Sequence, residues 1–389
     1  MTSGGGREIG LPFTRNAGFR ASDWDRDGSV AELLRSRLLE VIELKSHGAC
    51  VLPPRLDQGI ESYLSANRLR LREVCDGLPT IEGERMRRLF GGPMGLPLSA
   101  SGVGERAFVA EQVISMLPRY WKDPVRGALN AAMQIAAHRA IVEGAGKGEE
   151  AVTDLLVQGS LSFLARELVP ALAKARVVLK PGQTLDFAGA SMQGKTGDLF
   201  DSDLAIVIGT SIVGQPRYRV VLLQAKRCRS NFHADVSYKS GSQLDGLLST
   251  GMGYYLFYPS DGAGDVAFSP SVKDSRKVFE GARAGAGHVF SGIAAMDGEA
   301  VDLSLFVSTV MTLERPCVGR IFPSQDAVAD ALLGQRTRPV HILVLSEAVG
   351  ARVWTLVERL RAEGYGTSPV ASLADALGAL EQGDDWSGP

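Results

Sequence analysis

Residues 203–227 read DLAIVIGTSIVGQPRYRVVLLQAKR, two apolar runs joined by a segment with glycine and proline. Runs of aliphatic and β-branched residues bounded by turn residues are typical of buried strands. The first run, 203–208, begins at an aspartate, and the second, 218–226, ends in Gln-Ala-Lys. We predict that the two runs pair as an antiparallel hairpin through residues 209–217.

The predicted hairpin brings three polar side chains together. Gln224 and Lys226 share one face of the second strand, because side chains alternate along a strand. In an antiparallel pair the start of the first strand meets the end of the second, so we expect Asp203 beside them. Carboxylate and amide oxygens are hard ligands for Mg²⁺ or Mn²⁺, and an ammonium group can orient water or stabilise negative charge. This trio suits phosphodiester hydrolysis.

A neutral glutamine leaves the trio short of negative charge for a divalent cation, so at least one more carboxylate is expected. Two candidates, Asp198 and Asp201, stand on the approach to the first strand. Two others, Glu150 and Glu167, stand on a helix predicted at 150–175. The sequence does not choose among these acids.

Asp203 in SDLAIVI, followed by QAKR in VVLLQAKR, resembles the PD-(D/E)XK nuclease superfamily. The similarity is to the branch in which E-x-K is written Q-x-K, which includes the Mrr-like restriction enzymes. A downstream helix with Gln243 and the strand YYLFYP are also similar to that group. The resemblance covers about residues 150–260. It implies a restriction-endonuclease-like core, a central mixed sheet flanked by helices, with Asp203 and Gln224 as metal ligands and Lys226 as a catalytic group.

The resemblance implies a Mg²⁺-dependent endonuclease acting on DNA in bacterial restriction or defence, with RNA as a second candidate substrate. Partner proteins of a defence system and self-association are further expectations. The net charge of −2 means that nucleic acid would have to meet a local basic patch. Residues 217–229 form such a patch, which taken alone we interpret as a solvated basic edge. Candidate nucleic-acid contacts are Lys195, Arg227, Arg229 and Gln243.

Three other interpretations remain open. The polar residues could simply terminate strands at the surface, with Asp203 capping a strand end. The fold could serve as an inactive nucleic-acid-binding or assembly module. Residues 189–196 also match the phosphate-loop pattern G-x-x-x-x-G-K-[ST], which indicates nucleotide binding. The last interpretation has a weak context, because the preceding PGQTLDFA is a poor strand and the following residues include two acids.

The chain of 389 residues divides by pattern into four segments. We predict a disordered tail at 1–15, a mainly helical region at 16–145, the nuclease-like α/β core at 146–265, and an accessory α/β segment at 266–389. Further strands are expected at 176–179, 253–258, 318–322 and 340–345, and further helices at 237–250 and near Trp354.

Composition excludes several classes of protein. No apolar run is long enough to cross a membrane, and the N-terminal MTSGGGREIG lacks the apolar core of a secretory signal, so we expect a cytoplasmic protein without a membrane partner. The four cysteines are scattered, and the five histidines show no metal-ligand spacing. Neither a disulfide framework nor a histidine-based metal site is expected.

Overall fold

The computed structural model describes thirteen segments of the chain, which are 124–164, 168–174, 185–192, 202–212, 215–228, 233–237, 242–258, 270–283, 292–295, 299–311, 318–334, 338–347 and 353–382. The predicted tail at 1–15 and most of the predicted helical region lie outside these residues. The part of that region that is described forms helix α6 (Pro124–Glu143). No described helix is both long and apolar enough to cross a membrane.

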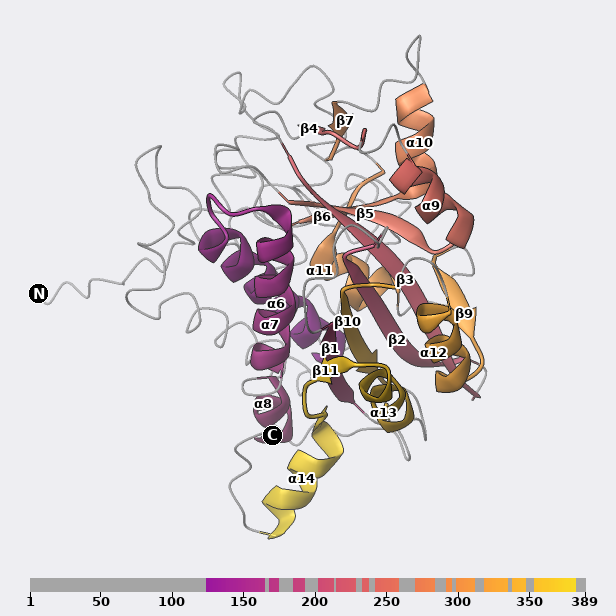
Figure 1. Ribbon diagram of the computed structural model, residues 1–389. Helices are drawn as coiled ribbons and strands as arrows, with labels where there is room; N and C mark the ends of the chain where they lie inside the picture. Colours follow the sequence, from indigo (N-terminus) through magenta and orange to yellow (C-terminus); the bar gives the residue numbers. More distant parts are fainter. Residues whose placement is uncertain are drawn as a thin grey trace, which may run out of the picture.

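The described residues form an α/β fold around a large mixed sheet, as predicted (Figure 1). Its strands follow the order β11-β1-β10-β2-β3-β5-β6-β8, with β12 beside β1 and β9 beside β3. The strands are β1 (Asp186–Met192), β2 (Leu204–Ile212), β3 (Gln215–Arg227), β5 (Gly253–Tyr258), β6 (Ser271–Asp274), β8 (Val301–Asp302), β9 (Arg320–Phe322), β10 (His341–Ser346), β11 (Tyr365–Thr367) and β12 (Ala371–Ser372). A separate pair is formed by β4 (His233–Ala234) and β7 (Ile293–Ala294).

The hairpin predicted from the opening stretch is confirmed. β2 and β3 pair antiparallel from Leu204↔Leu223 to Ile212↔Gln215, so the connection is shorter than the predicted loop. Alternate β3 residues enter different cores, Val221 and Leu223 on one face and Val220 on the other. At the far end of the hairpin β3 continues for four residues beyond Leu223, to Arg227. This overhang defines the edge where the predicted polar residues lie.

Strand β1 was not predicted, and it contains the first four residues of the phosphate-loop match. It pairs antiparallel with β10, and β10 in turn pairs parallel with β2. Strand β10 comes from the segment predicted as accessory, yet it lies between two strands of the predicted nuclease-like core. The sheet therefore draws on residues both before and after position 265.

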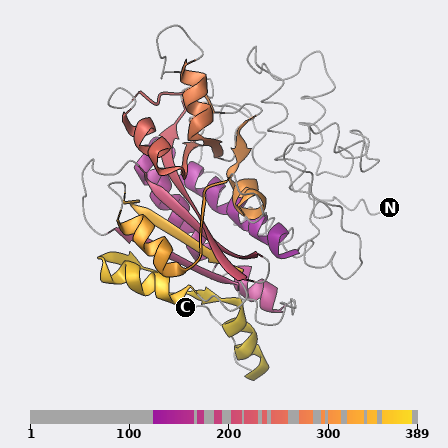
Figure 2. The same ribbon diagram turned by 90° about the vertical axis from the view of Figure 1, so that its right-hand side faces the viewer.

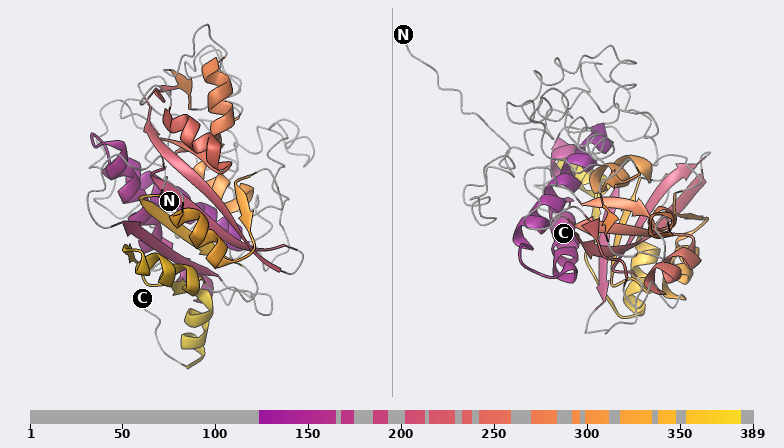
Figure 3. Two further views of the ribbon diagram at one scale, coloured as in Figure 1. Left: turned by 45° about the vertical axis from the view of Figure 1, so that its right-hand side comes forward. Right: turned by 90° about the horizontal axis from the view of Figure 1, so that it is seen from above.

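Helices cover both faces of the sheet, giving three layers (Figures 2 and 3). One face packs against α6, α7 (Glu149–Phe163), α8 (Val169–Lys174), α11 (Leu303–Leu305) with the π-helical turn Phe306–Val310, and α14 (Leu373–Gln382). The other packs against α9 (Ser242–Thr250), α10 (Ser275–Arg283), α12 (Gln325–Leu333) and α13 (Trp354–Ala362). The predicted helix at 150–175 corresponds to α7 and α8, with residues 165–167 outside the description.

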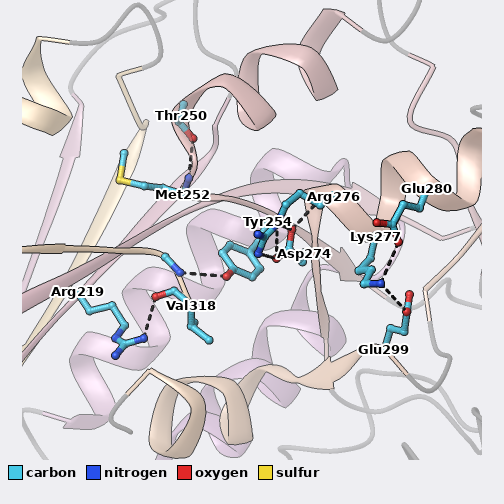
Figure 4. Close-up of polar contacts among 11 residues, drawn as sticks. Arg219, Thr250, Met252, Tyr254, Asp274, Arg276, Lys277, Glu280, Glu299 and Val318 are labelled. Atoms are coloured by element: carbon cyan, nitrogen blue, oxygen red, sulfur yellow. Dashed lines mark hydrogen bonds and ion pairs between the residues drawn. The ribbon is translucent and has the colours of Figure 1, made fainter. Parts of the chain in front are cut away.

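The segment before β9 is fastened to the sheet by polar contacts (Figure 4). The Gly319 amide donates to the Tyr254 hydroxyl at 3.0 Å, and the Arg219 guanidinium donates to the Val318 carbonyl at 2.8 Å. Gly319 has a φ of +60°, and a Cβ there would overlap the Val220 carbonyl, so glycine is required. Arg219 is only 3% exposed, which corrects its interpretation as part of a solvated basic edge.

Candidate functional site

The candidate site lies where β2 begins, β3 ends and α7 has its first turn. Asp203 immediately precedes β2, and its backbone is held on both sides. Its amide donates to the Leu223 carbonyl at 2.9 Å, and its carbonyl accepts from the His341 amide at 3.0 Å. The position of the Asp203 side chain is thus set by the two strands that flank β2.

Two carboxylates continue the hydrogen-bond ladder along the overhanging end of β3. The Ala225 amide donates to Asp203 Oδ2 at 2.8 Å. Two residues further on, the Arg227 amide donates to Glu149 Oε2 at 3.1 Å. Since backbone amides at a buried sheet edge need acceptors, this arrangement explains why acidic residues gather here. It also brings a residue of α7 to the sheet end.

Gln224 and Lys226 each contact one of these carboxylates. Gln224 Nε2 donates to Asp203 Oδ2 at 2.5 Å, and Lys226 Nζ lies 3.2 Å from Glu149 Oε1. Both side chains are buried, with Gln224 3% and Lys226 9% exposed. The structure therefore brings together the three residues that the sequence singled out, and adds Glu149 as a fourth.

Gln224 also presents an unsatisfied oxygen. Its Oε1 is buried and accepts no hydrogen bond among the described residues. A buried amide oxygen without a partner costs roughly 1–3 kcal/mol, so structures usually provide a donor or a ligand for it. Of the atoms in the site, Gln224 Oε1 is therefore the one that most directly indicates a bound donor or cation.

The pKa of Asp203 is raised to about 7. Burial is the largest cause, because it penalises the charged carboxylate. The Ala225 amide and the Lys226 ammonium lower the pKa, whereas the charges of Glu149 and Glu150 raise it. A carboxyl group whose pKa is raised toward 7 within a cluster of charged side chains is typical of functional sites.

Sequence reasoning missed Glu149 and named its neighbour, Glu150. Glu150 is exposed, and its charge acts on Asp203. The signal that distinguishes the two lies four residues further along the helix, where Glu149 is followed by buried Thr153 and Glu150 by the charged, exposed Asp154. Glu149 therefore belongs to the sheet-facing stripe of α7.

The other predicted site residues are placed as follows. Arg227 directs its guanidinium to the carbonyls of Gly144, at 3.2 Å, and Lys147. Gln243 lies in the first turn of α9 and is 6% exposed, and its Oε1 has no hydrogen-bond partner in the described part of the chain. Outside the described residues lie Glu167, Lys195, Asp198, Asp201 and Arg229.

The donor set is compatible with a hard divalent cation of the Mg²⁺ type. Across the described segments no three His, Cys, Asp or Glu side chains are grouped to hold a metal ion. A cation at this sheet end would therefore need the Gln224 amide oxygen beside the carboxylates of Asp203 and Glu149. The unsatisfied Gln224 Oε1 and the desolvated Asp203 carboxyl fit such a ligand, because both would be stabilised by a positive charge.

The phosphate-loop match lies partly in a strand. Gly189 pairs with Leu343 of β10, and on its other side its amide donates to Ser368 Oγ at 2.9 Å. The Gly189 carbonyl accepts from the Ser368 amide at 2.8 Å. A phosphate loop uses free backbone amides around the phosphates. The described half of the match therefore weighs against nucleotide binding, and residues 193–196 lie outside the description.

Comparisons with known proteins do not assign the chain to a family. No protein-family model matches it, and searches of curated proteins and of solved structures find no match either.

Proposed function

We propose that this protein is a metal-dependent nuclease with a restriction-endonuclease-like core, and that the end of strand β3 is its active site. One observation carries the proposal. At one end of the sheet Gln224 is hydrogen-bonded to Asp203 and Lys226 is paired with Glu149, and the charges of Lys226 and Glu149 both act on Asp203. The unsatisfied Gln224 oxygen supports a cation as the missing member of the cluster.

The chemistry follows from the residue types. Asp203, Gln224 and Glu149 would supply oxygen atoms to Mg²⁺, and the bound cation would neutralise phosphate charge and make water a better nucleophile. Lys226 holds an ammonium group beside Glu149, where it can orient the attacking water or stabilise negative charge on the phosphate. Attack of water on phosphorus forms one phosphorus–oxygen bond and breaks another; the attacking water gives up a proton to solvent, and the departing oxygen takes one up.

DNA is the proposed substrate, with restriction of foreign DNA in the bacterial cytoplasm as the proposed setting. These points depend on the resemblance of D…QxK to the Q-x-K branch of the nuclease superfamily. The residues named for nucleic-acid contact remain part of this proposal. Among them, Arg227 already binds two backbone carbonyls near the start of α7, so its first role is to hold that loop against β3.

The test is cleavage of supercoiled plasmid DNA by the purified full chain with Mg²⁺ or Mn²⁺. We expect wild-type protein to nick or linearise the plasmid, and Asp203→Asn and Lys226→Ala to lower the rate by at least about a hundredfold. Lys277→Ala is the matched control. This exposed lysine also forms ion pairs with glutamates, Glu280 and Glu299, but it belongs to α10 and not to the candidate site. Equal cutting by all four proteins would show that the activity arises elsewhere.

A second candidate function, an inactive nucleic-acid-binding or assembly module, is favoured by a specific observation. Both carboxylates already serve as acceptors for the β3 amides, which is a sufficient structural role for them. Under this alternative the wild-type protein binds DNA without cutting it under any metal, and Lys226→Ala changes affinity alone.

A further inference from the structure

A second polar cluster lies beside the candidate site, on the α7 face of the sheet. His341 Nδ1 is 2.9 Å from Ser191 Oγ, and His341 Nε2 is 3.1 Å from Asp154 Oδ1. Burial lowers the pKa of His341 more than the Asp154 carboxylate raises it, which favours the neutral imidazole. In that form one ring nitrogen donates and the other accepts, so Nε2–H donates to Asp154 and Ser191 donates to Nδ1.

This chain of contacts has the residue types of a serine nucleophile with its base. Such a nucleophile needs backbone amides to bind the oxyanion, typically including that of the following residue. Here the Met192 amide already donates to the Val340 carbonyl at 2.9 Å, and β1 is paired on both edges at Ser191, with β10 and β11. The cluster is therefore better explained by what it holds in place.

What it holds is helix α7. Asp154 is one residue after Thr153, whose hydroxyl donates to the Glu149 carbonyl at 2.9 Å. That hydroxyl has a single proton, so its second contact, at 2.9 Å, has the Tyr258 hydroxyl as donor. Two neighbouring residues of α7 are thus bound to opposite sides of the site, Thr153 to β5 and Asp154 to β10.

We propose that His341 and Asp154 are positioning residues which, together with the Tyr258–Thr153 contact, clamp the first turn of α7 so that Glu149 meets Lys226. The proposal rests on the proposed function for its catalytic consequence, but its geometric content does not depend on activity. The register supports it, because His341 pairs with Leu204, the residue directly after Asp203. One strand end therefore fixes both carboxylates, Asp203 through its backbone and Glu149 through α7.

Amide hydrogen exchange tests the clamp directly. The Arg227 amide donates to Glu149, whereas the Ala225 amide, on the same strand, donates to Asp203, which α7 does not carry. We expect Asp154→Ala and Tyr258→Phe each to speed exchange at Arg227 by about tenfold relative to Ala225, and the double variant to speed it further. Asp154→Asn keeps an acceptor oxygen for His341 and should retain most of the protection.

Asp154 is a safe position for this test because its side chain is 54% exposed, so its removal should leave the chain folded. Unchanged exchange at Arg227 in the double variant would overturn the clamp. So would equal acceleration at Arg227 and Ala225, since that result means general loosening of the sheet. His341→Gln tests the same contact from β10, and its effect is measured as the same ratio of Arg227 to Ala225 amide exchange rates.

Plasmid cleavage supplies the catalytic arm and separates the two proposals. If the protein is a nuclease, Asp154→Ala should lower kcat about tenfold with little change in KM, and Asp154→Asn should restore it. A selective exchange effect in a protein that neither cuts DNA nor binds Mn²⁺ would overturn the nuclease and keep the clamp. Full kcat in Asp154→Ala, despite faster Arg227 exchange, would overturn the positioning role.

Discussion

Asp203 is the residue at which the fold disfavours the form that the proposed chemistry needs, because its surroundings favour the protonated carboxyl and a metal ligand must be ionised. Its carboxyl is partly buried and accepts hydrogen bonds from Gln224 and Ala225, and this loss of solvent raises its pKa to about 7. Because the folded pKa lies above the unfolded value of 3.8, the folded state retains the proton in the range where the unfolded state loses it. The ionised carboxylate is therefore a cost to the protein without a cation.

The sign of this effect gives a pH prediction. Stability associated with Asp203 is fully present below about pH 4 and is lost as the pH rises through about 7. Asp203→Asn removes the titration while keeping an oxygen acceptor, so its stability relative to wild type should increase across this window, by at most about 4 kcal/mol. Urea unfolding with a chelator present, at several pH values, measures the difference. A pH-independent difference, or one that shrinks with rising pH, would contradict the assignment.

At the same scale, the sequence was sufficient to predict that Asp203, Gln224 and Lys226 lie at one end of the sheet, but not which helix acid joins them. Strand alternation and hairpin geometry are local rules, and they were sufficient for the trio. Choosing between Glu149 and Glu150 required the exact phase of α7 against the sheet. The spacing to the core is a weak guide to that phase, because the residues three and seven positions after either glutamate are buried and only the charged Asp154, four residues after Glu150, marks a difference.

At the scale of elements, the sheet order is the main feature that the sequence did not reveal. The apolar runs of β2, β3, β5 and β10 could be predicted as strands, because each is a compact run of aliphatic or aromatic residues. Strand β1 was not predicted, because its sequence, DFAGASM, is rich in small residues and contains the start of the phosphate-loop pattern. No local sequence pattern predicts that β10 pairs with β1 and β2, because strand pairing depends on three-dimensional packing.

The central place of β10 predicts that the segment 146–265 does not fold by itself. A chain ending at residue 265 lacks β10, so the edges of β1 and β2 that pair with it would have no partner strand. Residues of β1 that are buried in the full chain, such as Phe187 and Ala188, would become exposed to solvent. We expect this truncated chain to be aggregated or rapidly digested in limited proteolysis. A chain that lacks only residues 383–389, which follow α14, should resist digestion as the full chain does. A stable, protease-resistant 146–265 fragment would contradict this interpretation of the sheet.

At the scale of the whole molecule, a three-layer α/β fold carries a cluster of charged side chains at one end of its sheet. The overall charge of −2 gives no general attraction for nucleic acid, and part of the basic run at 217–229 is used internally. Arg219 supports the segment before β9, and Lys226 faces Glu149. Under the proposed function, a cation bound at the sheet end would supply positive charge for a phosphate group there.

The most direct test of this claim is Mn²⁺ binding by the full chain, measured from the loss of the free-ion electron paramagnetic resonance signal at about pH 8. It requires neither the correct substrate nor a partner protein. We predict about one bound Mn²⁺ per wild-type chain, displaced by Mg²⁺ and lost in Asp203→Asn, while Asp154→Asn binds as wild type does. Absence of binding, or equal binding by wild type and Asp203→Asn, would contradict a metal site at the end of β3.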